Sequence, residues 1–175
     1  MSNFINQSKD IFELQQIETA IKTDLDLDCQ ILSRSVDTPI DTLTVNIEAD
    51  GQGRSRIVSI MFVPLEDSDV ETLKLLQFYC ETPIRVDSAS TRATIAQLLA
   101  VINLNIPVGA FCFNSENEVT FKYVYALGKF KTIALEEFLE TFLLWMFGLD
   151  SMSELIETVA EGKHSLESAI QLMNE

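Results

Sequence analysis

Residues 90–127 read STRATIAQLLAVINLNIPVGAFCFNSENEVTFKYVYAL, and their hydrophobic period changes half-way along. The apolar positions of the first part, three or four residues apart, are Ile95, Leu98, Leu99 and Ile102. This period predicts an amphipathic helix over 91–104. The alternating positions of the last part are Val119, Phe121, Tyr123 and Tyr125. This period predicts a strand, and because one short loop joins the two parts, the helix and the hairpin around 114–117 should bury each other.

The loop between helix and hairpin contains a proline and a glycine. Pro107 has a fixed φ and disfavours the helical conformation of Ile106, so the helix should end there. Gly109 allows a close approach of the backbone as the chain enters the first strand of the hairpin. Phe111 and Phe113 should then share one face of that strand.

The residues before this stretch predict one helix and three strands. Apolar residues at helical spacing indicate a helix over 9–22. Alternation indicates strands over 27–32 and 43–47. A glycine-rich turn at 50–53 leads to a return strand over 56–63, whose nearly continuous apolar run favours a central position.

One segment, 71–86, fits either a strand or a helix. Val70, Leu73, Leu76 and Tyr79 recur at a spacing of three, but β-forming residues and Pro83 favour a strand.

The residues after the hairpin predict a single long helix. Its apolar phase continues through Gly148, and Thr132 is a suitable N-cap. Gly162 is suited to the C-terminal end of the helix, and Ser165 is suited to cap a short final helix.

The chain of 175 residues is long enough for one domain with a substantial core. No linker rich in Pro, Gly or Ser divides it, so we expect a single domain over 1–175, with 162–175 as a C-terminal extension. The order of helices and strands predicts an α+β fold with an antiparallel sheet packed against helices.

Charge and cysteine content restrict the classes of partner. A net charge of −15 with only 12 scattered basic residues disfavours nucleic acid and anionic membranes, and suits a basic protein partner. Cys29, Cys80 and Cys112 form no C-x-x-C pair, which is typical of free thiols in a reducing cytoplasm. No apolar run approaches the ~20 residues that a transmembrane helix needs.

We find no pattern of catalytic, cofactor-binding or metal-binding residues. The acidic run 24–28 begins like an EF-hand calcium loop, but Cys29 stands where glycine is needed and Ser35 where the acidic ligand is needed. His164 is the only histidine and follows a predicted helix end, far from any nucleophile pattern. Carboxylates are abundant, so a small-molecule site or an enzyme that uses a carboxylate between sheet and helix stays open as an alternative.

The long helix is apolar on more than one face. One face must contact the sheet, which leaves Leu144, Trp145 and Phe147 for the opposite side. Such a wide apolar face belongs either to the core or to a subunit or ligand surface, and we favour the surface of a dimer or of a protein partner.

The block 95–111, followed by Glu118, Val119, Thr120, Phe121, Lys122 and Tyr123, resembles the YbjN family, whose members are often labelled bacterial sensory transduction regulators. The shared features are a helix that ends in Asn, a Pro-x-Gly-x-Phe step, an aromatic hairpin strand and a long C-terminal helix. The resemblance implies a fold like that of type III secretion chaperones, commonly homodimeric, and a chaperone-like or regulatory protein without catalytic residues. The residues 162–175 and the acidic run near Asp24 are not part of the motif.

Overall fold

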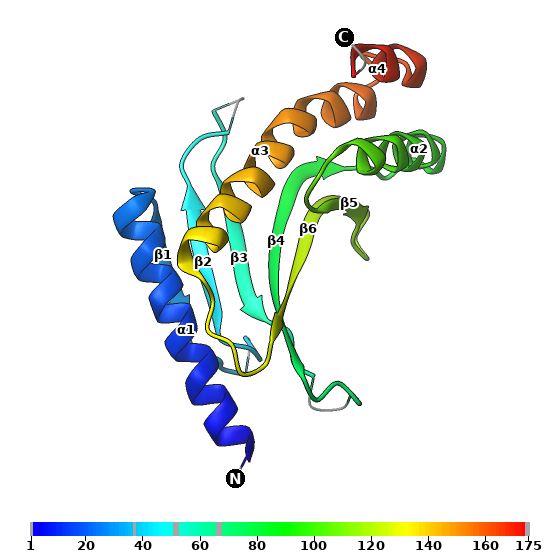
Figure 1. Cartoon of the computed structure of the whole chain (residues 1–175). Helices are drawn as coiled ribbons and strands as arrows, with labels where there is room; N and C mark the ends of the chain where they lie inside the picture. Colours follow the sequence, from blue (N-terminus) through cyan, green and yellow to red (C-terminus); the bar gives the residue numbers. More distant parts are fainter. Residues whose placement is uncertain (1, 37, 51–52, 66–67, 174–175) are drawn as a thin grey trace.

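A computed structural model describes residues 2–36, 38–50, 53–65 and 68–173, which form a six-stranded sheet with helices over one face (Figure 1). The elements in chain order are α1 (Ser2–Asp24), β1 (Asp28–Leu32), β2 (Thr42–Ile47), β3 (Arg56–Phe62), β4 (Leu73–Arg85), α2 (Ala89–Asn105), β5 (Ala110–Phe113), β6 (Glu118–Gly128), α3 (Leu135–Ala160) and α4 (Leu166–Leu172). Every neighbouring pair of strands is antiparallel, in the order β1-β2-β3-β4-β6-β5. The expected α+β class is therefore confirmed.

The ambiguous segment 71–86 is the long strand β4, as favoured. Its side chains alternate between buried and more exposed from Leu73 to Arg85, which is the pattern of a sheet with one covered face. Pro83 lies where the register with β6 shifts between Glu81 and Arg85. The missing N–H of Pro83 therefore interrupts no regular ladder hydrogen bond.

The expected N-terminal strands are also present, and β3 lies between β2 and β4. In the turn before β3, residues 51 and 52 lie outside the described residues. Gly53 has a φ of 76°, and its N–H donates to the carbonyl of Asp50 at 2.9 Å. A positive φ is the conformation for which glycine is favoured in such a turn.

Two helix starts differ from expectation. Helix α1 begins at Ser2 rather than near residue 9, since no proline or glycine in 2–8 stops it. Helix α3 has Ala134 rather than Thr132 as its N-cap. It runs unbroken through Gly148, as expected. Gly162, with a φ of 75°, directly follows Glu161, the C-cap residue of α3. Ser165 is the N-cap of α4, and its side chain accepts a hydrogen bond from the N–H of Ser168.

The edge strand β5 is held by a side chain. The amide of Asn103, on α2, donates to the carbonyl of Phe111 at 3.0 Å and accepts from the N–H of Phe111 at 2.8 Å. The amide thus replaces a missing neighbouring strand at this point. Asn103 explains why a helix end and a short edge strand stay together.

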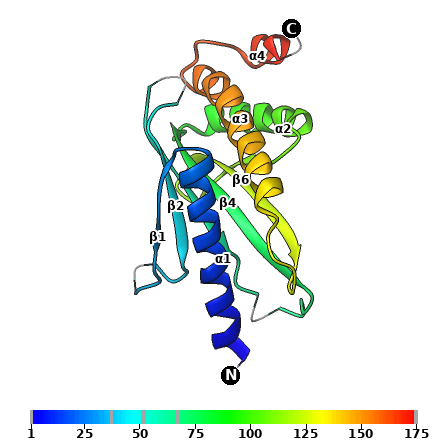
Figure 2. The ribbon, with the colours of Figure 1, turned by 60° about the vertical axis from the view of Figure 1, so that its left-hand side comes forward.

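Helices α1 and α3 cover different parts of the same face (Figures 1 and 2). Helix α1 contacts β1 and β2, whereas α3 crosses β4 and contacts α2. Helix α4, within the predicted extension, packs on α2 through the buried Ala169. The two chain ends lie at opposite ends of the molecule in both views.

Candidate functional site

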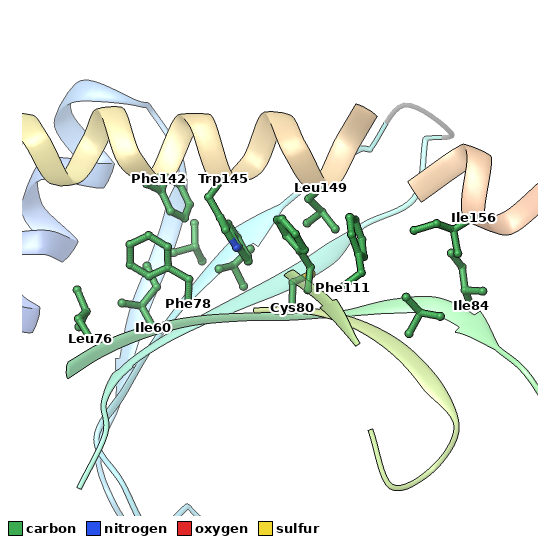
Figure 3. Close-up of a cluster of buried hydrophobic side chains, with 14 of the residues drawn as sticks. Ile60, Leu76, Phe78, Cys80, Ile84, Phe111, Phe142, Trp145, Leu149 and Ile156 are labelled. Carbon is green, nitrogen blue, oxygen red and sulfur yellow. The ribbon is translucent and has the colours of Figure 1, made fainter. Parts of the chain in front are cut away.

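The inner face of α3 is part of the core, and it includes Trp145. Figure 3 shows Phe142, Trp145 and Leu149 directed from α3 toward the sheet. The Trp145 ring lies 5.1 Å from that of Phe121 and 5.7 Å from that of Phe78, measured between centroids. Trp145 has no exposed surface, so its expected place on the opposite side of the helix is wrong.

Gly109 explains how so large a side chain fits there. A Cβ atom at this position would lie 2.6 Å from Cζ of Phe121 and 2.9 Å from Cδ1 of Trp145. The loop before β5 therefore packs directly on both rings. The indole N–H of Trp145 has no hydrogen-bond partner among the described residues, which is uncommon for a buried donor. The indole N–H of a tryptophan usually has a polar partner, and for this reason many tryptophans lie at partly exposed positions, as was expected for Trp145.

The outer face of α3 carries the other two expected residues. Leu144 is 42% exposed and Phe147 is 69% exposed, and Leu143 beside them is 49% exposed. We call Leu143, Leu144 and Phe147 the α3 patch. Helical spacing places Glu136, Glu137 and Glu140 before this patch and Glu154 after it, all exposed. The patch is thus apolar with acidic residues at both ends.

A cavity of about 390 Å³ lies elsewhere, against α1. None of its lining residues belongs to α3. Its walls come from α1, the β1–β2 connection, the end of β3 and the residues after it, the start of β4, and the residue after β6. The lining residues are Lys9, Asp10, Leu14, Arg34, Pro39, Ile40, Asp41, Phe62, Val63, Pro64, Leu65, Ser68, Val70, Glu71, Leu73, Lys74 and Lys129.

A buried ion pair lies at this cavity. The ammonium group of Lys74 donates to both carboxylate oxygens of Glu13, and these side chains are only 9% and 2% exposed. Lys74 also lies 5.3 Å from the centroid of the Phe62 ring. The Nζ atom of Lys9 is 4.0 Å from Glu13 and donates to the backbone carbonyl of Lys129 at 3.3 Å.

Neither Glu13 nor Lys74 was among the residues that sequence reasoning selected. In the structure, Glu13 is buried beside Leu14. The spacing of both residues indicated burial. Glu13 is four residues before the buried Ile17, so the two lie on the same side of α1, and Lys74 is two residues before the buried Leu76, so the two point to the same face of β4. A charged residue in the buried phase of two facing elements indicates a pair.

The remaining candidates stay apart in the structure. His164 is exposed in the turn before α4. Cys29 and Cys80 are buried and Cys112 is exposed, all three as free thiols. Burial raises the pKa of Cys80 to about 11. Within the described ranges, no group of three or more His, Cys, Asp or Glu is arranged to hold a metal ion, and no helix is long and apolar enough to cross a membrane.

Comparisons with known proteins give a likeness among solved structures. No protein-family model matches the chain, and a search of curated proteins gives no match. Among solved structures, the chain is similar to the crystal structure of YbjN from E. coli, a proposed transcription regulator. The two chains share 11% identity with a TM-score of 0.43, and the match covers 81% of this chain and 91% of YbjN.

Proposed function

We propose that the protein is a non-enzymatic binding module, chaperone-like or regulatory, that binds a basic protein segment on the α3 patch. The observation that carries this proposal is the exposure of Leu143, Leu144 and Phe147 together on one helix. A helix that already buries its opposite face in the core has no structural need for three large apolar residues outside. A rigid apolar patch of this kind is suited to an amphipathic partner segment.

The acidic residues around the patch favour a basic partner. Glu136, Glu140 and Glu154 form no ion pair with any described residue. Each therefore offers a charge to Lys or Arg side chains of a partner at the rim of the patch. With a net charge of −15, the whole chain would also speed the approach of such a partner.

We further propose a homodimer, as the resemblance implies, through the face of the sheet opposite the helices. One row across five strands of that face carries no charge. Its members, from the register of the strands, are Leu32, Thr42, Met61, Gln77 and Val124. Two acidic chains repel each other least where neither contributes a charge, so this row suits a second copy better than the α3 patch does.

Affinity capture from a bacterial lysate tests the partner proposal when variants are compared. The variant Leu144→Ser/Phe147→Ser should lose a defined basic polypeptide that the wild-type protein retains. Phe12→Ser is the matched control, because Phe12 is also an exposed phenylalanine on a helix, at 57%. With the partner in hand, Phe147→Ser should weaken binding at least tenfold, and Glu140→Gln/Glu154→Gln should weaken it less and reduce its salt dependence. The same polypeptides on the wild type and the double-serine variant would refute the proposal.

Light scattering tests the homodimer. The wild-type protein should give the mass of two chains at micromolar concentration, and Val124→Lys should give one. A wild-type protein that is monomeric at high concentration contradicts this part of the proposal alone.

The alternative of a small-molecule site that uses a carboxylate between sheet and helix has one observation in its favour. Glu13 is such a carboxylate, and its partner Lys74 lines the cavity of about 390 Å³. Both of its oxygens are engaged by Lys74, however, which disfavours a role as general base. The cavity is therefore better suited to binding than to catalysis.

A further inference from the structure

We propose that the cavity against α1 binds a small organic anion with an apolar body, whose charged group lies near Lys74 and Lys9. Its volume of about 390 Å³ is within the range of small-molecule sites. This site goes beyond the proposed protein binding, because it shares no residue with the α3 patch.

The buried floor of the cavity is apolar and basic. Only three of its lining residues are buried, namely Leu14, Phe62 and Lys74. Two of these are apolar and the third is a cation. The counterion of Lys74 is Glu13, which is not among the lining residues, so the wall receives the cation of this pair and not its carboxylate. A ligand that reaches the floor meets apolar side chains and a positive charge.

The charges of Glu13, Lys74 and Lys9 do not cancel. Two ammonium groups, those of Lys74 and Lys9, share the single carboxylate of Glu13. This leaves one positive charge beside the buried pair, on the Lys9 side chain, which is 39% exposed and attracts an anion through partly screened electrostatics. The negative charge of the rest of the chain acts over longer distances and is screened beyond about 8–10 Å at ordinary salt. The local excess therefore decides which ligand is favoured at the floor.

The rim of the cavity contains acidic and basic residues. Lys129 adds a further cation beside Lys9. Asp41 accepts a hydrogen bond from the backbone N–H of Arg34 at 2.9 Å, and Asp10 also has a partner, so neither carboxylate is free. Glu71 is exposed. Asp10 and Asp41 are half-buried, as are Lys9 and Lys129, so the rim carries both signs of charge, whereas the buried end, formed by Leu14, Phe62 and Lys74, is basic and apolar.

Binding of matched probes tests the proposal. The probes are 3-phenylpropionate and octanoate, each with its neutral amide and its ammonium analogue, and binding is followed by the NMR shifts of backbone amides in α1 and β4. Each carboxylate should bind with a Kd in the millimolar range or below, as is usual for ligands of this size. It should bind at least tenfold more tightly than its amide, and the ammonium analogue should bind most weakly.

Two variants and one control variant show whether Lys74 and Lys129 supply the charges that bind the carboxylate. Glu13→Leu/Lys74→Met replaces the ion pair by apolar residues of similar size, a change that folded proteins often tolerate. This variant should bind the carboxylate and the amide equally. Lys129→Gln should weaken carboxylate binding about two- to fivefold, the range of a partly exposed charge. Lys163→Gln, at an exposed lysine near α4, should change nothing.

The proposal is wrong if neither carboxylate shifts the amides of α1 and β4 at millimolar concentration, or if the ammonium analogue binds best. It is also wrong if Glu13→Leu/Lys74→Met remains folded and keeps the preference for carboxylates. None of these outcomes concerns the α3 patch, so the proposed protein binding stands or falls separately.

Discussion

The covered face of the sheet has two halves that differ in what they bury. Beneath α3, the inward side chains of β4 include the buried Cys80 and Phe78, and the Phe78 ring meets three aromatic rings of α3 (Figure 3). Beneath α1, the same strand presents Lys74 to Glu13 at the side of a cavity. One strand therefore passes from an ion pair beside open volume to close-packed rings.

This difference distinguishes a region built for packing from one suited to binding. Close packing stabilises, and even the backbone at Gly109 has no room for a methyl group. A buried ion pair beside a cavity adds little to stability, because desolvation offsets much of its attraction. The half of the sheet under α1 combines an open cavity with a charged side chain, and a ligand site requires both.

The largest expected effect is at the ion pair. Lys74→Met leaves the carboxylate of Glu13 buried with Lys9 at 4.0 Å as its remaining neighbour, so it should reduce the free energy of unfolding by about 3–5 kcal/mol. The double variant Glu13→Leu/Lys74→Met should lie within about 1 kcal/mol of the wild type. Urea denaturation measures both. Equal losses in the single and double variants would remove the distinction between the two halves.

Gly109→Ala examines the packed half. The new methyl group meets Phe121 and Trp145, and alanine is strained at a φ of 89°, so we expect a loss of about 3 kcal/mol or more. Gly162→Ala has a similar φ but open space around it, and should cost about 1 kcal/mol. The difference between these two values, from the same denaturation experiment, isolates the packing effect.

Cys80 gives the packed half a dependence on pH. Because the pKa of its thiol is raised to about 11 in the folded protein, the neutral form is favoured by folding. This stability is present below the ordinary pKa of about 9 and is lost as pH rises from there to about 11. The free energy of unfolding should fall by about 1.4 kcal/mol more between pH 8 and 10 in the wild type than in Cys80→Ala. Parallel pH profiles for the two proteins would contradict this.

The smallest effect is expected at the α3 patch. Leu144→Ser/Phe147→Ser alters exposed side chains only, so the free energy of unfolding should change by less than about 0.5 kcal/mol. A large loss of stability would mean that the outer face of α3 also belongs to the packed half. In that case, loss of a partner by this variant would no longer identify a binding surface.

Several features could be predicted from local sequence because they depend on near neighbours. The alternation in 43–47 and 56–63, the period of α2 and the step at Pro107 and Gly109 each follow from backbone geometry and the periods of helix and strand. The favoured strand over 71–86 was also correct. The sequence alone thus determined the α+β class and the order of the elements between 27 and 160.

The tertiary structure decided what the two sides of α3 and α1 face. The helical spacing of Trp145 from Phe142 and Leu149 places these three residues on one face of α3, but only the position of the sheet decides that this face is buried and that Leu144 and Phe147 are exposed. Lys74 and Glu13 are 61 positions apart, so their pairing depends on how α1 lies over β4. Hydrophobic period fixes which residues share a face, but the contacts of that face depend on how distant elements pack.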